Sequence, residues 1–134
     1  MHDVFSPPWV DAWIAEIRGS DAYRRAAAGW EGSLALELLA DEPRAVLLDL
    51  WHGDCRSGQM ASAAELETAD YVLAADLGTW KRVLGGEIEP IFGLMSGKLK
   101  LRRGSLAKLT PYVAASKELV AAAGRVPTRF PDDD

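Results

Sequence analysis

The side chains that could perform covalent chemistry are few and lie in one short stretch of the sequence. His52 and Cys55 are three residues apart, with Asp49 and Asp54 close by. A thiol beside an imidazole could form a nucleophile and base, for instance in an acyl-CoA thioesterase. Such a site also needs an orienting group and an oxyanion site, and neither is visible in the sequence. We therefore interpret Cys55 as a small apolar residue and His52 as a turn residue, and predict no catalytic residue and no enzyme activity.

Metal and cofactor sites are not indicated. Two histidines and one cysteine cannot make a standard zinc site, and no carboxylate spacing suggests one. The sequence has no glycine motif that would cradle a phosphate, since Gly85-Gly86 is better interpreted as the end of a helix. We expect neither a metal nor a cofactor.

Composition limits the class of protein. The chain has 134 residues, 49% of them hydrophobic, and a net charge of -5, which disfavours nucleic acid as a partner. This length fits one domain over residues 1–134, with a frayed tail over 127–134. One cysteine excludes an intrachain disulfide and indicates a reducing compartment. We see no secretory signal and no stretch of about 18 apolar residues, so we expect a cytoplasmic protein without stable membrane insertion.

The elements that must position these residues follow from the hydrophobic pattern. Ser6-Pro7-Pro8 begins a helix that ends at Gly19, and Ser20-Asp21 begins a second, short one. Further helices are predicted over 79–84, 90–95 and 105–123. Strands are predicted over 33–39, 45–51, 55–60, 69–75 and 98–102, where apolar residues alternate or cluster. Short turns between strands favour antiparallel pairing, and helices grouped in blocks should cover one face, which is the α+β class.

A family resemblance is carried by the second half of the chain. The residues are Trp80, Leu84-Gly85-Gly86, Glu89-Pro90-Ile91 and the run from Met95 to Leu101, with Trp30-Glu31-Gly32 and Ala69-Asp70-Tyr71 upstream. This pattern resembles the sterol carrier protein type 2 family, also called nonspecific lipid-transfer proteins. The Met-Ser-Gly-Lys-Leu-Lys-Leu run is the most specific part of a likeness that extends from about Trp30 to Val120.

The chain departs from the family pattern in three places. Glu89 stands where Asp is common, Gly104-Ser105 replaces Gly-Asp, and the chain ends in Asp132-Asp133-Asp134 instead of a peroxisomal address. The absence of that address, together with the extra N-terminal helix around Trp9 and Trp13, resembles a stand-alone, bacterial-type member.

The resemblance implies a specific fold and ligand. It implies a five-stranded, mostly antiparallel sheet, helices over one face, and an apolar tunnel between the two layers. It also implies that the protein binds a fatty acid, fatty acyl-CoA or sterol. Whether the protein transfers this ligand is left open. The alternative is an accessory or dimerisation module for a separately encoded enzyme, with Trp9, Trp13 and Trp51 on the contact surface. Whether the protein forms a homodimer is also left open.

The residues alone also point to an apolar site. Apolar side chains cover most of the circumference of the short helix over 90–95, so it should be buried or line a cavity. The expected ligand-binding residues are Trp80, Leu84, Ile91, Phe92, Met95, Leu99, Leu101, Leu109, Val113 and Val120. On the residues alone plain core packing explains the same pattern better, and the family resemblance brings the two interpretations level.

Two further features leave alternatives open. Lys98, Lys100 and Arg102 share one face of a predicted strand, which is either a basic rim for an anionic headgroup or membrane or a solvated face that discourages edge pairing. The alanine-rich helix over 105–123 is either a mobile lid or a fixed cover.

Overall fold

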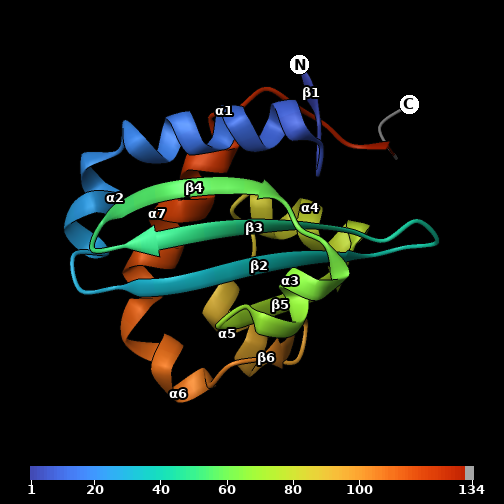
Figure 1. Ribbon diagram of the computed structural model, residues 1–134. Coiled ribbons are helices and arrows are strands. Elements are labelled where there is room, and N and C mark those ends of the chain that lie inside the picture. Colours follow the sequence, from blue (N-terminus) through green and yellow to red (C-terminus); the bar gives the residue numbers. More distant parts are fainter. Residues whose placement is uncertain (132–134) are drawn as a thin grey trace.

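A five-stranded sheet with helices behind it forms the centre of the computed structural model, which describes residues 1–131 (Figure 1). The strands lie in the order β4 (Asp54–Met60), β3 (Arg44–Trp51), β2 (Glu31–Leu39), β5 (Tyr71–Asp76) and β6 (Lys100–Arg103). Neighbours are antiparallel except β2 and β5, which are parallel. The predicted α+β class with a mostly antiparallel sheet is confirmed.

Alternation along β2 decides which face of the sheet the helices cover. Leu34, Leu36 and Leu38 belong to the main hydrophobic core, together with side chains of the helical layer. Ala35 points to the other face and joins Val72 in a small second cluster. Side chains in a strand alternate between the two faces, so one face of β2 meets the helices and the other is more open.

The helical layer contains most of the helices. They are α1 (Pro7–Arg18), α2 (Asp21–Ala26), α4 (Leu77–Leu84), α5 (Pro90–Met95) and α7 (Val113–Gly124). In Figure 1 the long helix α7 runs behind the sheet toward α1. Helix α1 lies against β4, where a Cβ added at Gly58 would be 2.5 Å from Ile14 Cδ1. Glycine at that position lets helix and strand approach closely.

One short helix, α3 (Ala63–Thr68), was not predicted and lies over the open face of the sheet. Its Leu66 packs against the small cluster around Ala35 and Val72. The helix begins with a capping box in which Ser62 and Glu65 exchange hydrogen bonds. A serine followed three residues later by glutamate is a local signal for a helix start, so this element could have been found in the sequence.

The predicted continuous helix over 105–123 is wrong. The structure divides it into α6 (Leu106–Leu109), a 3₁₀ turn, η1 (Thr110–Tyr112), and α7. Pro111 lacks a main-chain N–H and its ring obstructs the preceding turn, which interrupts the helical ladder.

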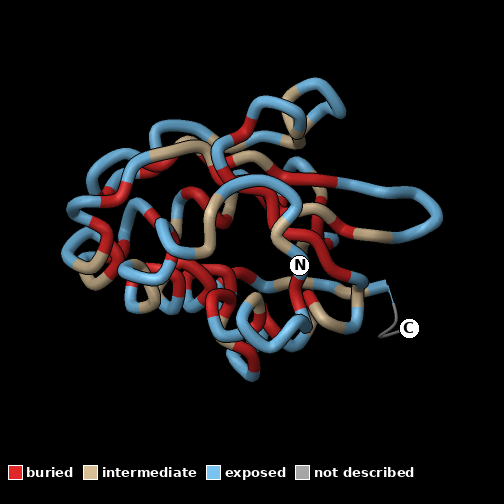
Figure 2. The backbone as a smooth tube through the Cα atoms, turned by 90° about the horizontal axis from the view of Figure 1, so that it is seen from below, coloured by how far each residue is buried: buried red, intermediate tan, exposed pale blue. Residues whose placement is uncertain are grey.

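The two ends of the described chain meet in a second, two-stranded sheet. β1 (His2–Asp3) pairs in parallel with β7 (Thr128–Arg129), and Trp9 Nε1 donates to Thr128 Oγ1 at 3.0 Å. The prediction of a frayed tail over 127–134 is therefore wrong for Thr128 and Arg129. Residues 132–134 lie outside the described part of the chain. Figure 2 shows buried backbone at the centre of the molecule and exposed backbone in the outer loops.

Candidate ligand-binding site

An apolar cavity of about 20 Å³ lies between the sheet and the helical layer. Its walls come from β2, β5, α1, α4, α5, α6 and α7 and from the residues that precede β2. The lining residues are Trp13, Trp30, Leu34, Leu36, Leu73, Trp80, Pro90, Ile91, Leu109, Ser116, Leu119 and Val120. A volume of this size holds about one water molecule, whereas ligand pockets measure roughly 300–1,000 Å³. The arrangement in the structure is therefore a closed one.

Three tryptophans give the cavity much of its wall. Trp13 Nε1 donates to the carbonyl of Leu119 at 3.0 Å, and Trp80 Nε1 donates to the carbonyl of Glu37 at 2.9 Å. Trp30 stacks on Tyr112, with ring centroids 5.2 Å apart and planes inclined by 10°. Because the indole N–H groups of Trp13 and Trp80 bond to the main chain, these rings supply an apolar surface with no unsatisfied donor.

Four of the ten predicted binding residues line the cavity: Trp80, Ile91, Leu109 and Val120. Leu84 borders a neighbouring surface groove of about 270 Å³, formed between the α4–α5 turn and α7, which Val120 also reaches. Leu99 is buried below α5, where a Cβ added at Gly93 would be 3.1 Å from Leu99 Cδ1. The structure thus places these residues in one region of the helical layer.

The remaining predicted residues lie farther out. Leu101 and Val113 are half-buried and pack against the core. Phe92 and Met95 are 56% and 52% exposed, so the expected burial of α5 on all sides is wrong. The inner side of this short helix, with the buried Pro90, Ile91 and Gly93 and the half-buried Leu94, meets the rest of the protein. Ligand contacts of the predicted residues stay a prediction.

Several lining residues were not among the predicted ones. They are Trp13, Trp30, Leu34, Leu36, Leu73, Pro90, Ser116 and Leu119. Alternation along β2 and helical spacing along α1 and α7 mark most of them as core residues. No local pattern distinguishes core residues that border a void from those that fill the interior, because the void depends on how the two layers fit.

The structure does not assemble Cys55 and His52 into a catalytic pair. The ring nitrogens of His52 lie 3.0 Å from the carbonyl of Ala28 and 3.0 Å from Glu31 Oε2. Cys55 is fully buried, and its thiol donates to the carbonyl of Ser57 at 3.3 Å. Burial raises the pKa of the Cys55 thiol to about 11. A protonated thiol away from solvent is not a nucleophile.

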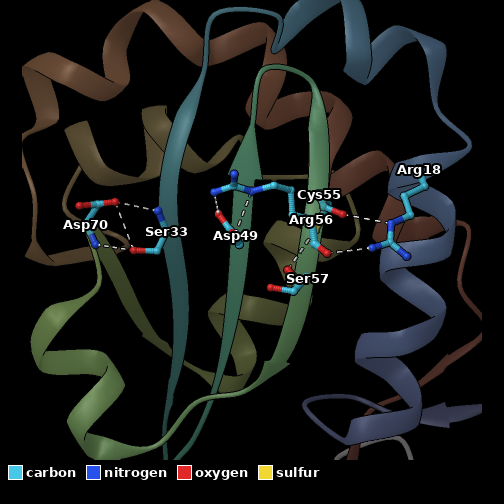
Figure 3. A network of polar contacts seen from close by, with 7 residues as sticks. All are labelled: Arg18, Ser33, Asp49, Cys55, Arg56, Ser57 and Asp70. Atoms are coloured by element: carbon cyan, nitrogen blue, oxygen red, sulfur yellow. Dashed lines mark hydrogen bonds and ion pairs between the residues drawn. The ribbon is translucent and has the colours of Figure 1, made fainter.

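A polar network crosses the open face of the sheet (Figure 3). Asp49 accepts two hydrogen bonds from Arg56, both 3.1 Å long, and the Arg56 guanidinium lies 4.6 Å from the ring centroid of Trp51. Asp70 Oδ2 accepts from the main-chain N–H of Ser33 at 2.8 Å. These residues border a shallow groove of about 640 Å³, but they are engaged with one another. We interpret the network as bracing between strands.

The prediction that Trp9 and Trp13 lie on a contact surface is also wrong, because both side chains are fully buried. The Trp9 ring centroid lies 5.5 Å from that of Phe5 and 5.1 Å from that of Trp13, within one aromatic cluster. Trp51 remains 44% exposed. A partner surface that depends on the first two tryptophans is therefore excluded.

The basic residues around β6 have different surroundings. Arg102 pairs with Glu37 at 3.1 Å, and Arg103 Nε donates to the carbonyl of Ala69 at 2.9 Å. Lys98 and Lys100 are exposed. Strand β6 forms one edge of the sheet, where charged side chains discourage pairing with another chain.

Residues 1–131 hold neither a metal-binding cluster nor a membrane-spanning helix. They contain no group of three or more His, Cys, Asp or Glu side chains placed to hold a metal ion. No helix among them has both the length and the apolar character needed to cross a membrane.

Comparisons with known proteins agree with this architecture. A crystal structure of sterol carrier protein 2 is 43% identical, with a TM-score of 0.84 over 92% of this chain and 99% of its own. A solution structure of a conserved hypothetical protein from Thermus thermophilus, possibly sterol carrier protein, is 42% identical, with a TM-score of 0.86 over 96% of this chain and 93% of its own.

A more distant likeness extends to an insect protein. Palmitated SCP2L2 from Aedes aegypti is 19% identical over 81% of this chain and 93% of its own, with a TM-score of 0.50, and shares the fold. A comparison with curated protein sequences found no match. The model of the SCP-2 sterol transfer family matches residues 13–113. This chain belongs to the SCP-2 sterol transfer family.

Proposed function

We propose that this protein binds a fatty acid, fatty acyl-CoA or sterol-like lipid between its sheet and helical layer, and carries it without covalent chemistry. The observation that supports this most is the apolar cavity between the two layers. Among its lining residues, only Ser116 carries a hydroxyl group. Each methylene group moved from water into such a site contributes about 0.8 kcal/mol. Family membership and the palmitated state of the Aedes aegypti protein support the same ligand class.

Binding requires the closed cavity to expand. Helix α7 is the element suited to move, because most of its buried residues are alanine or serine: Ala115, Ser116, Ala122 and Ala123. Small side chains lose little apolar contact when a helix shifts outward. The ligand then replaces the contacts that Leu119 and Val120 make with the opposite wall. In this proposal α7 acts as a lid.

The test is displacement of a fluorescent fatty acid in solution at micromolar protein, with palmitate, palmitoyl-CoA and a sterol as competitors. Ser116→Phe should fill the cavity and weaken binding about tenfold or more while far-ultraviolet circular dichroism is unchanged. The matched control is Ala114→Leu, which adds an apolar side chain on the exposed side of α7 and should leave binding unchanged. If none of the three ligand classes binds to the unmodified protein, the proposal fails.

Native mass spectrometry of protein purified from its own host adds the ligand's identity. A co-purifying mass in the range of a fatty acid, an acyl-CoA or a sterol would assign the class. Loss of that mass in Ser116→Phe and its retention in Ala114→Leu would place the ligand in the cavity.

A further inference from the structure

The hydroxyl group of Ser116 lies at the apolar cavity without a hydrogen-bond partner in the described chain. The side chain is 5% exposed and belongs to the part of the cavity wall that α7 contributes. A hydroxyl in a helix can bond back to a carbonyl one turn earlier, as Thr110 does to Leu106 at 2.8 Å. The other buried serine, Ser20, accepts from the main-chain N–H of Tyr23 at 3.1 Å. Ser116 does neither, so its hydroxyl is free to bond to a guest in the cavity.

The surroundings of Ser116 differ from those of the unpaired hydroxyl of Tyr23. Tyr23 is 0% exposed, and its hydroxyl is enclosed on all sides by the core. Ser116 keeps accessible surface and borders the space between the sheet and the helical layer. Its position, as well as the lack of a partner, makes the Ser116 hydroxyl available to a ligand.

Trp30 adds a second unpaired polar group to the same wall. It is 3% exposed, and its indole N–H has no hydrogen-bond partner among the residues that the structure describes, unlike those of Trp13 and Trp80. The Trp30 ring stacks on Tyr112, which precedes Ser116 by four residues and therefore by about one helical turn. A donor and a hydroxyl that can donate or accept thus lie near the same end of α7.

The charge of the cavity wall decides which lipid group suits these partners. No charged side chain is among the described residues that line the cavity. An ionised carboxylate moved into this space would lose its hydration without gaining a cation, which is strongly unfavourable. An alcohol is far easier to bury, because Ser116 can accept a hydrogen bond from its O–H group while Trp30 donates to its oxygen. The wall therefore favours a guest whose buried end carries a neutral alcohol group.

We propose that Ser116 is a specificity-determining residue of this site, which selects lipids with an alcohol group, such as fatty alcohols and sterols, over ionised fatty acids. An alcohol enters with its hydroxyl group inward and pairs with Ser116. A fatty acid enters with its methyl end inward, keeps its carboxylate at the surface and leaves the Ser116 hydroxyl unpaired. This selection rests on the proposed function, because it concerns the same cavity after expansion.

The test compares dodecanol with laurate, which share one chain length and differ in the head group. Each competes with a fluorescent fatty acid at neutral pH on the unmodified protein, Ser116→Thr and Ser116→Val. Threonine and valine have nearly the same shape, so the two variants disturb packing alike and differ in the hydroxyl. The unmodified protein and Ser116→Thr should prefer dodecanol. Ser116→Val should lose about fivefold in affinity for dodecanol relative to Ser116→Thr, and none for laurate.

The exposed side of the same helix provides matched controls. Ala114→Thr and Ala114→Val introduce the same two side chains where the helix faces solvent. Both should leave the ratio of the dodecanol and laurate affinities unchanged, because neither side chain reaches the cavity.

Urea unfolding of the ligand-free protein reports on the hydroxyl without any lipid. An unpaired buried hydroxyl destabilises the folded state, so Ser116→Val should unfold at a higher urea concentration than Ser116→Thr. The difference between Ala114→Val and Ala114→Thr should be smaller, since water satisfies an exposed hydroxyl. A lower midpoint for Ser116→Val than for Ser116→Thr would show that the protein itself satisfies the hydroxyl, and would overturn the proposal.

The binding results also separate this inference from the proposed function. An equal loss of affinity for both lipids in Ser116→Val, or no loss for dodecanol, would overturn the role of Ser116 and leave the lipid site standing. If no lipid binds to the unmodified protein, the proposed function fails and the selection fails with it.

Discussion

The indole N–H of Trp13 donates to the main-chain carbonyl of Leu119 at 3.0 Å, a contact between residues 106 positions apart in the chain. It ties α1 to α7, and both side chains also border the cavity. The bond therefore joins the helix proposed as the lid to a helix that packs on the sheet through Ile14 and Gly58.

Loss of this bond should destabilise the protein and loosen α7. Trp13→Phe removes a buried donor and part of a large side chain, which should lower the free energy of unfolding by about 2–3 kcal/mol in a urea titration. Amide exchange in α7 should accelerate more than amide exchange in β2 and β3. Trp9→Phe, which removes the partly buried bond to Thr128, is the control and should leave α7 exchange nearly unchanged. Equal acceleration in both variants would contradict a specific tie to α7.

The β3–β4 hairpin depends on a glycine for two separate reasons. His52 and Gly53 form a two-residue loop with φ values of 48° and 89°, and a Cβ added at Gly53 would lie 2.6 Å from the main-chain oxygen of Arg24. Gly53→Ala should cost about 2–4 kcal/mol, since backbone strain and a close contact with α2 act together. Gly97→Ala has the strain alone, because φ is 79° and no atom lies within 4 Å, and should cost about 1 kcal/mol. If thermal unfolding shows a similar loss of stability in Gly53→Ala and Gly97→Ala, the contact with α2 is unimportant.

The Cys55 thiol should make the protein sensitive to alkali. Burial raises its pKa from the ordinary 9.0 to about 11, so the folded state holds the proton more tightly than the unfolded state. The stability contributed by the protonated thiol is fully present below about pH 9 and is lost as pH rises toward 11, up to about 3 kcal/mol. Cys55→Ala should flatten that decline in denaturant titrations across this range. The thiol should also resist modification at neutral pH until the protein unfolds, and rapid labelling of the native state would contradict its burial.

The hydroxyl of Tyr23 is buried with no hydrogen-bond partner among the described residues. Burial, with a smaller contribution from Cys55, raises the pKa of this phenol. Tyr23→Phe keeps the ring and removes the unsatisfied group, so it should raise the free energy of unfolding by about 1 kcal/mol. Tyr112→Phe is the contrast, because its hydroxyl donates to the carbonyl of Gly29 at 3.1 Å, and it should lower stability. Destabilisation by Tyr23→Phe would indicate that the hydroxyl is satisfied.

The capping box of α3 should be visible in a titration. The main-chain N–H of Ser62 donates to the carboxylate of Glu65 and holds the pKa of that group below its ordinary value. The stabilisation is present at neutral pH and is lost as pH falls through the lowered pKa. Ser62→Ala removes the hydroxyl that accepts a hydrogen bond from the main-chain N–H of Glu65, so the pKa of Glu65 measured by NMR should rise. Ser105→Ala is the control, since its hydroxyl makes no capping bond.

The sequence by itself determined the elements whose signals are local. Ser6-Pro7-Pro8 and Gly19 bound α1 as predicted, and the alternation of Leu34, Leu36 and Leu38 identified β2 and its buried face. Pro90 likewise marked the start of α5. Propensity, capping and periodicity act within a few residues, which is why they can be recognised without a structure. The missed interruption at Pro111 and the missed start of α3 at Ser62 were local signals too.

The tertiary structure alone decided how distant segments meet. The parallel pairing of β2 with β5, the burial of Trp9 and Trp13, and the pairing of β1 with β7 all join segments far apart in the chain. Exposure of Phe92 and Met95 follows in the same way, because a neighbour covers only one side of α5. The residues around the cavity come from seven described helices and strands and from the segment before β2. A void between two layers depends on how well their side chains fit, which no single segment of the sequence encodes.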